Sequence, residues 1–361
     1  MPLLLSSILA NSSRTQQPFI LLQSSAAQSC LPVLQAIISQ SPQHHSKPLT
    51  KRHVLLFCFL YPPARIAASL KVDTANIELH TYDWTGKVPG YDDEEPFDIN
   101  EEVLKAIQAV PSTEPFDVVL DSADTLLSSL ESASKTYTLL SKSLSLVRCG
   151  PATSRLIVHI VSPSPLIPQL TQTRFSSSLT HLTSHPPALL LHVSSAYLTL
   201  PPPLSPPEKF WSVFGPISER WYESEKLVFG GDGEGWGGED VVVEVLIRGP
   251  GAGDGGRKRG VERVLEGWKS DVGRPSELSD LESLKSLWSK KAIVPEEPAA
   301  DPTQNVSFNL NLTPEQQQAR AQVPLPYAHE GKQVPTEAAI LYDPDSADDI
   351  DDDDPDEDLD I

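Results

Sequence analysis

The stretch from Phe19 to Cys30 is written FILLQSSAAQSC. It begins with an apolar run typical of a buried strand, and Leu31, Leu34, Ile37 and Ile38 then follow at the spacing of one helix face. A strand followed at once by a helix is the opening unit of a parallel α/β fold. In nucleotide-binding versions of this fold, the turn between them carries glycine and lysine that hold phosphates. The turn here, from Gln23 to Cys30, contains neither, and no Gly-Lys pair in the chain completes a Walker A motif. The sequence predicts the scaffold without its phosphate loop.

Apolar runs alternate with helical patterns through the first two thirds of the chain. We expect further strands at residues 53–60, 77–82, 116–121, 155–161 and 188–193. We expect a helix over 101–110, capped by Asp98 or Asn100, and one long helical stretch over 122–147. Continuous apolar strands separated by helices indicate a mostly parallel sheet covered on both faces. The fold class expected is therefore α/β.

The pattern changes after residue 200. Short strands are expected at 227–229, 240–247 and 260–268, joined by glycine-rich turns as in antiparallel hairpins, with a last helix over 276–289. From residue 295 onward proline, acidic and polar residues dominate, a composition typical of disorder. We predict one domain over 1–294 and a largely disordered acidic tail over 295–361.

Net charge is concentrated in that tail. The whole chain carries −21, of which eleven Asp and one Glu in residues 343–361 supply −12, leaving −9 for residues 1–342. The body is only mildly acidic, so contact with a nucleic acid is not excluded where basic residues cluster. Three scattered cysteines fit neither a disulfide framework nor a zinc site, and no run reaches the ~20 apolar residues of a membrane span. We expect a soluble intracellular protein.

Asp121 ends the run Phe116–Leu120 and stands where a Walker B carboxylate would hold Mg²⁺ through water. The other interpretation is an aspartate that caps a helix starting near Ser122. Without a phosphate loop we favour the cap.

The strongest basic cluster is Arg257, Lys258 and Arg259, flanked by Arg248 and Arg263. It follows Gly251–Gly256, which formally matches a dinucleotide fingerprint but is followed by a strand pattern where that motif needs a helix, so we interpret it as a hairpin turn. Basic turns bind phosphate backbones without reading sequence. A solvated turn or a contact with an acidic neighbour remains an equal alternative.

Candidate catalytic and metal groups are few. His181 and His185 are four residues apart, as on one helix face, but no acidic or cysteine partner is near and Pro186 follows. No serine elbow or cysteine nucleophile motif is present. We therefore predict no catalytic residues, no metal and no cofactor.

One segment of the tail is unlike the rest. Phe308, Leu310 and Leu312 alternate with polar residues like a strand, and a capping box follows at Thr313–Gln316. A docking segment near 306–327 is expected, because such a strand can add to the sheet edge of a neighbour.

Together, four segments resemble the Elongator complex protein 5 family, in a fungal version of it. They are Phe19–Ile38, Val241–Trp268, Ser307–Arg320 and the end ILYDPDSADDIDDDDPDEDLDI. The resemblance implies a RecA-like fold without a working phosphate loop, assembled with two sibling RecA-like subunits into a hetero-hexameric ring. That ring is the accessory part of Elongator, which modifies the wobble uridine of tRNA, and it works with the Elongator catalytic core in cytoplasm and nucleus.

The function expected is that of a non-catalytic ring subunit that supplies interfaces and part of a tRNA surface, with Arg257, Lys258 and Arg259 as tRNA contacts. Two alternatives stay open. One is a divergent RecA-like NTPase that uses Asp121, and the other is a general scaffold unrelated to tRNA.

Overall fold

The computed structural model describes residues 3–12, 17–39, 51–67, 77–86, 98–230, 240–250 and 259–289, together with Glu315 and Gln318. The chain divides into two compact units, Met1–Ile293 and Val294–Ile361, and every helix and strand with assigned bounds lies in the first. The expected docking residues Phe308, Leu310 and Leu312 lie outside the described residues. Within the described ranges, no helix has the length and apolar character needed to cross a bilayer.

A single nine-stranded sheet forms the centre of the first unit, in the order β3-β2-β4-β5-β1-β6-β7-β8-β9. Its first six strands pair in parallel, whereas β7, β8 and β9 pair antiparallel. The predicted fold class, a mostly parallel α/β sheet with a C-terminal antiparallel region, is confirmed. The strands are β1 (Phe19–Ser25), β2 (Arg52–Cys58), β3 (Ile77–Asp83), β4 (Phe116–Leu120), β5 (Arg155–Ser162), β6 (Leu179–His185), β7 (Asp240–Pro250), β8 (Arg259–Lys269) and β9 (Arg274–Ser276).

The central strands are mostly apolar because both of their faces are buried. In β1, Ile20 and Leu22 pack into the core beneath the N-terminal helices, whereas Phe19 and Leu21 pack into the core on the opposite face. This alternation is the two-residue period of a strand. Residues 19–22 of β1 are therefore apolar on both faces, which is why the sequence predicted burial there.

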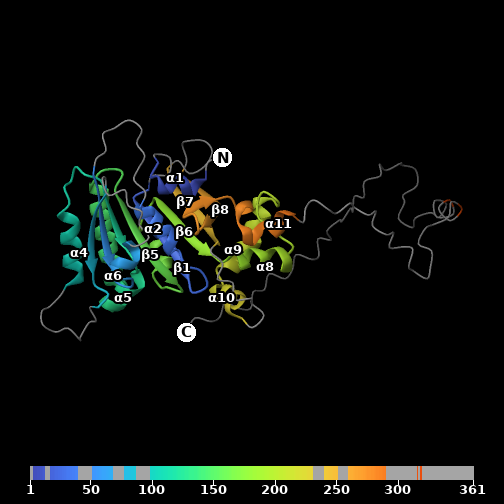
Figure 1. Ribbon diagram of the computed structural model, residues 1–361, viewed down its shortest axis with the longest axis horizontal. Helices are drawn as coiled ribbons and strands as arrows, with labels where there is room; N and C mark the ends of the chain where they lie inside the picture. Colours follow the sequence, from blue (N-terminus) through green and yellow to red (C-terminus); the bar gives the residue numbers. More distant parts are fainter. Residues whose placement is uncertain are drawn as a thin grey trace, which may run out of the picture. The chain divides into compact units, whose positions relative to one another are not determined.

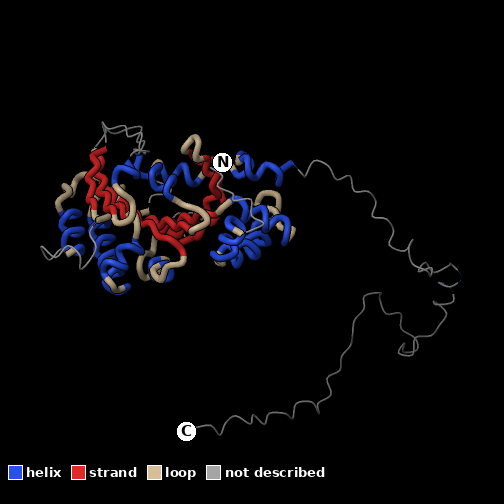
Figure 2. The backbone as a smooth tube through the Cα atoms, turned by 60° about the horizontal axis from the view of Figure 1, so that its bottom comes forward, coloured by secondary structure: helices blue, strands red, loops and turns tan. Residues whose placement is uncertain are grey.

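Eleven α-helices are described, and they cover both faces of the sheet (Figures 1 and 2). On one face lie α1 and α2, and on the other α4, α5 and α6 cover the parallel strands while α8 and α9 cover the antiparallel end. The helices are α1 (Leu4–Leu9), α2 (Leu31–Ser39), α3 (Pro63–Ala67), α4 (Ile99–Gln108), α5 (Ala123–Leu130), α6 (Ala133–Cys149), α7 (Ile167–Leu170), α8 (Pro187–Ala196), α9 (Pro207–Ser218), α10 (Trp221–Phe229) and α11 (Lys285–Ser289).

Two helices, α5 and α6, replace the single long helix expected over 122–147. The break falls at Glu131, whose φ of 50° is left-handed, and at Ser132, whose side chain accepts a hydrogen bond from the Lys135 amide. A left-handed residue ends one helix and a serine N-cap begins the next. Apolar residues continue at helical spacing on both sides of Ser132, so the sequence pattern did not mark the break.

Other expected elements were wrong in kind. Residues 188–193 form part of α8 rather than a strand, because Pro187 occupies the first turn of a helix there. The strand of this region is β6, which places His181 and His185 on a strand rather than a helix. Residues 227–229 end α10. In place of a helix over 276–289 the chain forms two 3-10 turns, Leu278–Asp280 and Glu282–Leu284, and the short α11. Short apolar runs do not distinguish a buried helix from a buried strand.

Helix α1 is held to the sheet by polar contacts from distant residues. The carboxylate of Glu266 accepts hydrogen bonds from the amides of Leu4 and Leu5 at 2.7 and 2.8 Å. At the other end of α1, the Arg155 guanidinium donates to the carbonyl of Ile8 at 3.3 Å. Glu266 thus caps a helix that has no side-chain cap of its own.

Candidate functional site

The carboxyl ends of β1 and β4 form the edge at which a nucleotide would bind in this class of fold. Asp121 directly follows β4 there and is fully buried. One of its carboxylate oxygens accepts the amide of Phe59 at 2.7 Å, and the other accepts those of Leu60 at 2.9 Å and Tyr61 at 2.7 Å. Both oxygens therefore hold the loop that follows β2.

The expected helix cap is supplied by the next residue instead. The Ser122 hydroxyl accepts a hydrogen bond from the amide of Thr125 and caps α5. The interpretation of Asp121 as that cap was therefore wrong, because its side chain points back to the β2–α3 loop. Burial raises the pKa of the Asp121 carboxyl, although its three amide donors oppose the shift.

In the turn between β1 and α2, serine side chains of the turn accept hydrogen bonds from its backbone amides. β1 extends to Ser25, and serine side chains then take the amides that a phosphate would bind in a glycine-rich loop. The accepting pairs are Ser24 with the Cys30 amide at 2.8 Å, Ser25 with the Gln28 amide at 3.1 Å and Ser29 with the Leu31 amide at 3.2 Å. Serine hydroxyls in this turn therefore accept the hydrogen bonds of backbone amides that a glycine-rich loop would leave for a phosphate.

His159 on β5 contacts both Asp121 and the serine-containing turn after β1. Its Nδ1 lies 2.6 Å from the Asp121 carbonyl oxygen, and its Nε2 lies 2.7 Å from the Ser24 hydroxyl. A carbonyl can only accept, so Nδ1 donates, Nε2 accepts in the neutral ring, and Ser24 donates to it. Burial lowers the pKa of His159, which agrees with the neutral form. We call Ser24, Asp121 and His159 the strand-end network.

The contact between Ser24 and His159 has the length of a nucleophile–base pair, but its surroundings differ from a catalytic one. His159 is 0% exposed and Ser24 is also buried. The ring is oriented by a backbone carbonyl rather than by a carboxylate. The strand-end network is therefore a structural tie between β1, β4 and β5.

The basic hairpin is only partly described. Arg259 begins β8, and Arg257 and Lys258 lie outside the described residues. The side chains of the two flanking arginines form hydrogen bonds within this chain. Arg248 donates to the carbonyls of Thr171 and Ser176 at 2.7 and 2.9 Å.

Arg263, the other flanking arginine, donates to Glu244 at 2.6 Å and stacks over the Trp211 ring, with its guanidinium carbon 4.1 Å from the centroid. Glu244 also meets His185 at 3.1 Å. Burial would raise the pKa of Glu244, but His185 and Arg263 outweigh it and lower the pKa to about 2. Arg248 and Arg263 are therefore part of the fold, which the sequence did not indicate.

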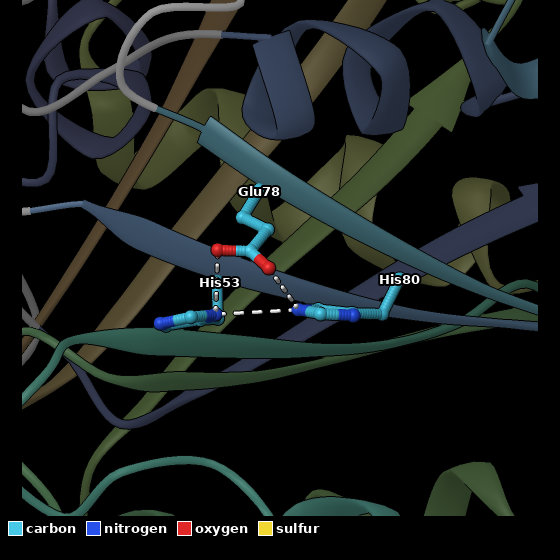
Figure 3. Close-up of side chains that lie close together, drawn as sticks. All are labelled: His53, Glu78 and His80. Carbon is cyan, nitrogen blue, oxygen red and sulfur yellow. Dashed lines mark hydrogen bonds and ion pairs between the residues drawn. The ribbon is translucent and has the colours of Figure 1, made fainter.

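The sequence analysis did not find a group of potential metal ligands that lies on β2 and β3, toward the amino ends of these strands. His53 on β2 lies beside Glu78 and His80 on β3 (Figure 3). The two histidines that the sequence indicated, His181 and His185, have different partners, Gln23 and Glu244. The usable signal was Glu78-x-His80 on a strand, where residues two apart share a face.

An exposed apolar surface lies at the end of α8 and along α10, two helices that contact each other. Leu198 is 81% exposed and Phe229 is 67% exposed. The same surface carries the exposed rings Tyr197, Trp221 and Tyr222. Exposed aromatic groups of this kind are typical of protein interfaces.

Comparison with known proteins finds a family similar to the later part of the chain. Residues 225–343 match the profile of the family described as Elongator subunit Iki1. The match begins within α10 and contains the β7–β8 hairpin, the basic cluster and the expected docking segment.

Curated proteins named Elongator complex protein 5 are similar to shorter stretches of the chain. The chain is 38% identical over 91 residues to the human Elongator complex protein 5, which covers 23% of this chain and 30% of the relative. It is 38% identical over 68 residues to the zebrafish (Danio rerio) protein of that name, covering 17% and 23%, and 40% identical over 70 residues to the mouse protein, covering 17% and 23%. The alignments thus span less than a third of the relatives' length.

A similar solved structure is a KaiC-like protein from the hyperthermophilic archaeon Pyrococcus horikoshii. The superposition has a TM-score of 0.37 at 10% identity and covers 72% of this chain and 88% of the other.

Proposed function

We propose that this chain is a non-catalytic subunit of the Elongator accessory ring and supports modification of the tRNA wobble uridine through assembly and tRNA binding. Its partners in this proposal are two sibling RecA-like subunits, the Elongator catalytic core and tRNA, in cytoplasm and nucleus. The observation that carries the proposal is the match of residues 225–343 to the Elongator subunit Iki1 family.

The strand-end network supports a non-catalytic role. Both carboxylate oxygens of Asp121 are occupied by backbone amides, and serine hydroxyls occupy amides of the turn where phosphate would bind. A divergent NTPase that used Asp121 would have to bring Mg²⁺ or its bound water to a buried carboxylate that already accepts three amide hydrogen bonds. The general-scaffold alternative has no observation in its favour beyond the exposed apolar surface.

Two features suit assembly with other subunits. The first is the exposed apolar surface on α8 and α10, with Trp221 and Tyr222. The second is the outer edge of β8, which pairs with β9 only over Gly267–Lys269, so that its earlier residues have no strand partner on that side among the described elements. An open edge of this kind accepts an added strand.

Assembly is tested by reconstituting the ring with the sibling subunits. We expect that deleting residues 303–361 converts part or all of the hexamer to smaller species in size-exclusion chromatography with light scattering, because the docking segment is removed. A control that deletes only residues 343–361 removes the acidic end and keeps Phe308, Leu310 and Leu312. An intact hexamer from the longer deletion would refute the docking role.

Binding of tRNA is tested by charge reversal in the reconstituted ring. We expect that changing Arg257, Lys258 and Arg259 to Glu weakens tRNA affinity and reduces the slope of log K against log salt by about 2 to 3 where each residue contacts one phosphate. The matched control reverses Lys105, Lys135 and Lys142, which lie on α4 and α6. Equal affinities for the two variants at low salt would contradict the assignment.

A further inference from the structure

Two neighbouring strands place three metal-ligating side chains together. β2 and β3 pair in parallel with His53 opposite Glu78, and His80 follows two residues further along β3. Residues two apart on a strand share a face, so Glu78 and His80 point to the same side. Figure 3 shows the Glu78 carboxylate facing both imidazole rings.

The distances between the ligand atoms suit a tetrahedral ion. His53 Nδ1 lies 3.3 Å from His80 Nε2, and the Glu78 oxygens lie 3.8 Å from His53 Nδ1 and 3.6 Å from His80 Nε2. Zinc bonds of about 2.0 to 2.1 Å in tetrahedral geometry put neighbouring ligand atoms about 3.3 to 3.5 Å apart. One ion could therefore be reached by all three groups with shifts of only a few tenths of an ångström.

A second carboxylate orients the buried histidine. His53 Nε2 is hydrogen-bonded to the carboxylate of Glu114, which precedes β4. Histidines that bind metals commonly donate their other ring N–H to a carboxylate, which fixes the tautomer and leaves the first nitrogen free to coordinate. Glu114 thus directs the lone pair of His53 Nδ1 toward Glu78 and His80.

The charges at this position call for a cation. Among the described residues, the ion pairs formed by Glu78 and Glu114 are with histidines alone. The two carboxylates bring negative charge to the two imidazoles, which a divalent ion would offset. The Glu78 and His80 side chains are 47% and 37% exposed, so the position is open to ions from solvent and to water as a fourth ligand.

From this geometry we propose that His53, Glu78 and His80 bind a zinc ion, with Glu114 positioning His53. Imidazole nitrogen together with a carboxylate suits zinc among the abundant divalent ions, whereas magnesium and calcium prefer oxygen ligands throughout. We call these four residues the histidine–glutamate cluster. The proposal rests on β2 and β3 and is independent of the Elongator assignment.

Zinc binding is measured on the full chain, freed of any purification tag, by competition with a chromophoric chelator. We expect one zinc per chain, and at least tenfold weaker binding in His80→Ala and in Glu78→Gln. The matched control is His192→Ala, which removes a histidine from α8 and should leave affinity unchanged. Both test residues are partly exposed, and circular dichroism without metal shows whether each variant keeps its fold.

Coordination is checked separately with Co²⁺, whose visible spectrum reports tetrahedral nitrogen and oxygen ligands. We expect that spectrum in the unaltered chain and in His192→Ala, and its loss in His80→Ala. The proposal is overturned where the unaltered chain binds no zinc, or where folded His80→Ala and Glu78→Gln bind it as tightly as the unaltered chain. In the second case the ion binds elsewhere.

Discussion

The strand-end network and the histidine–glutamate cluster occupy opposite strand ends of the same sheet and differ in how their polar groups are satisfied. In the first, the Ser24 hydroxyl, both His159 nitrogens and both Asp121 carboxylate oxygens have a protein partner, and all three residues are buried. In the second, Glu78 and His80 are partly exposed and the carboxylates meet only imidazoles among described ion pairs. A closed network stabilises a fold, whereas an open one with excess charge is ready for a ligand.

The largest effect on stability is expected from removing the Asp121 carboxylate. Asp121→Ala leaves the buried amide of Phe59 and the partly buried amides of Leu60 and Tyr61 without their acceptors. We expect a loss of about 3 to 5 kcal/mol in unfolding free energy, since each buried unsatisfied group costs about 1 to 3 kcal/mol. Urea denaturation measures it. Asp271→Asn, in an exposed turn, is the control, and an equally small effect at both positions would show that the network does not hold the edge together.

A smaller effect is expected at Ser24. Ser24→Ala removes the acceptor of the Cys30 amide and the donor to His159 Nε2, and both atoms are buried. We expect a loss of about 2 to 3 kcal/mol in unfolding free energy. Ser145→Ala, which removes an exposed hydroxyl bonded only within α6, is the matched control. If Ser24→Ala proved as stable as the unaltered chain, water would have to enter and satisfy these groups.

In the histidine–glutamate cluster, the role of Glu114 in positioning His53 is tested by substitution. Glu114→Gln keeps the shape of the side chain but weakens the hydrogen bond to His53 Nε2. We expect zinc affinity to fall about 10- to 100-fold, the usual effect of removing a carboxylate that orients a metal-binding histidine. Chelator competition gives the ratio, with Glu131→Gln, at the surface between α5 and α6, as the control. Unchanged affinity would assign Glu114 to the fold alone.

The smallest expected effect is on the pH dependence of stability, and it concerns His181, which lies near the strand-end network. His181 on β6 meets Gln23 on β1 at 2.9 Å, and burial lowers its pKa from 6.5 to about 4. Between these values the unfolded chain binds a proton that the folded chain does not, so stability is complete above pH 6.5 and is lost as pH falls toward 4.

We expect this residue to account for about 1 to 2 kcal/mol of the acid destabilisation, less than the full shift implies because the ring is only partly buried. His181→Gln should flatten the dependence of the denaturation midpoint on pH between 6.5 and 4. His192→Gln serves as the control. An unchanged slope in His181→Gln would place the acid-sensitive group elsewhere.

The sequence predicted the sheet best where both faces are buried. The run Phe19–Leu22 can only be a buried segment, and the lack of glycine and lysine after it indicated a turn without phosphate contacts. The prediction failed at residues 188–193, where an apolar run of leucines fits a buried helix as well as a strand. There the proline at the first helical position was the better signal.

The side-chain partners could not be predicted in the same way. Asp121 binds amides about 60 residues earlier in the chain, and the ligands His53 and Glu78 come from strands 25 positions apart. Such contacts depend on strand order and register, which propensity and periodicity do not contain. The roles of Arg257, Lys258, Arg259, Phe308, Leu310 and Leu312 stay predictions.

The cap that Glu266 provides for α1 has a consequence for synthesis. Leu4 is 262 residues before its acceptor, so it leaves the ribosome long before β8 exists. At about 5 to 20 residues per second, the delay is roughly 13 to 50 seconds. During that time the apolar face of α1, with Leu5, Ile8 and Leu9, has no finished sheet to cover it. The apolar face of α1 therefore stays without its complete sheet until the residues of β8 have also been synthesised.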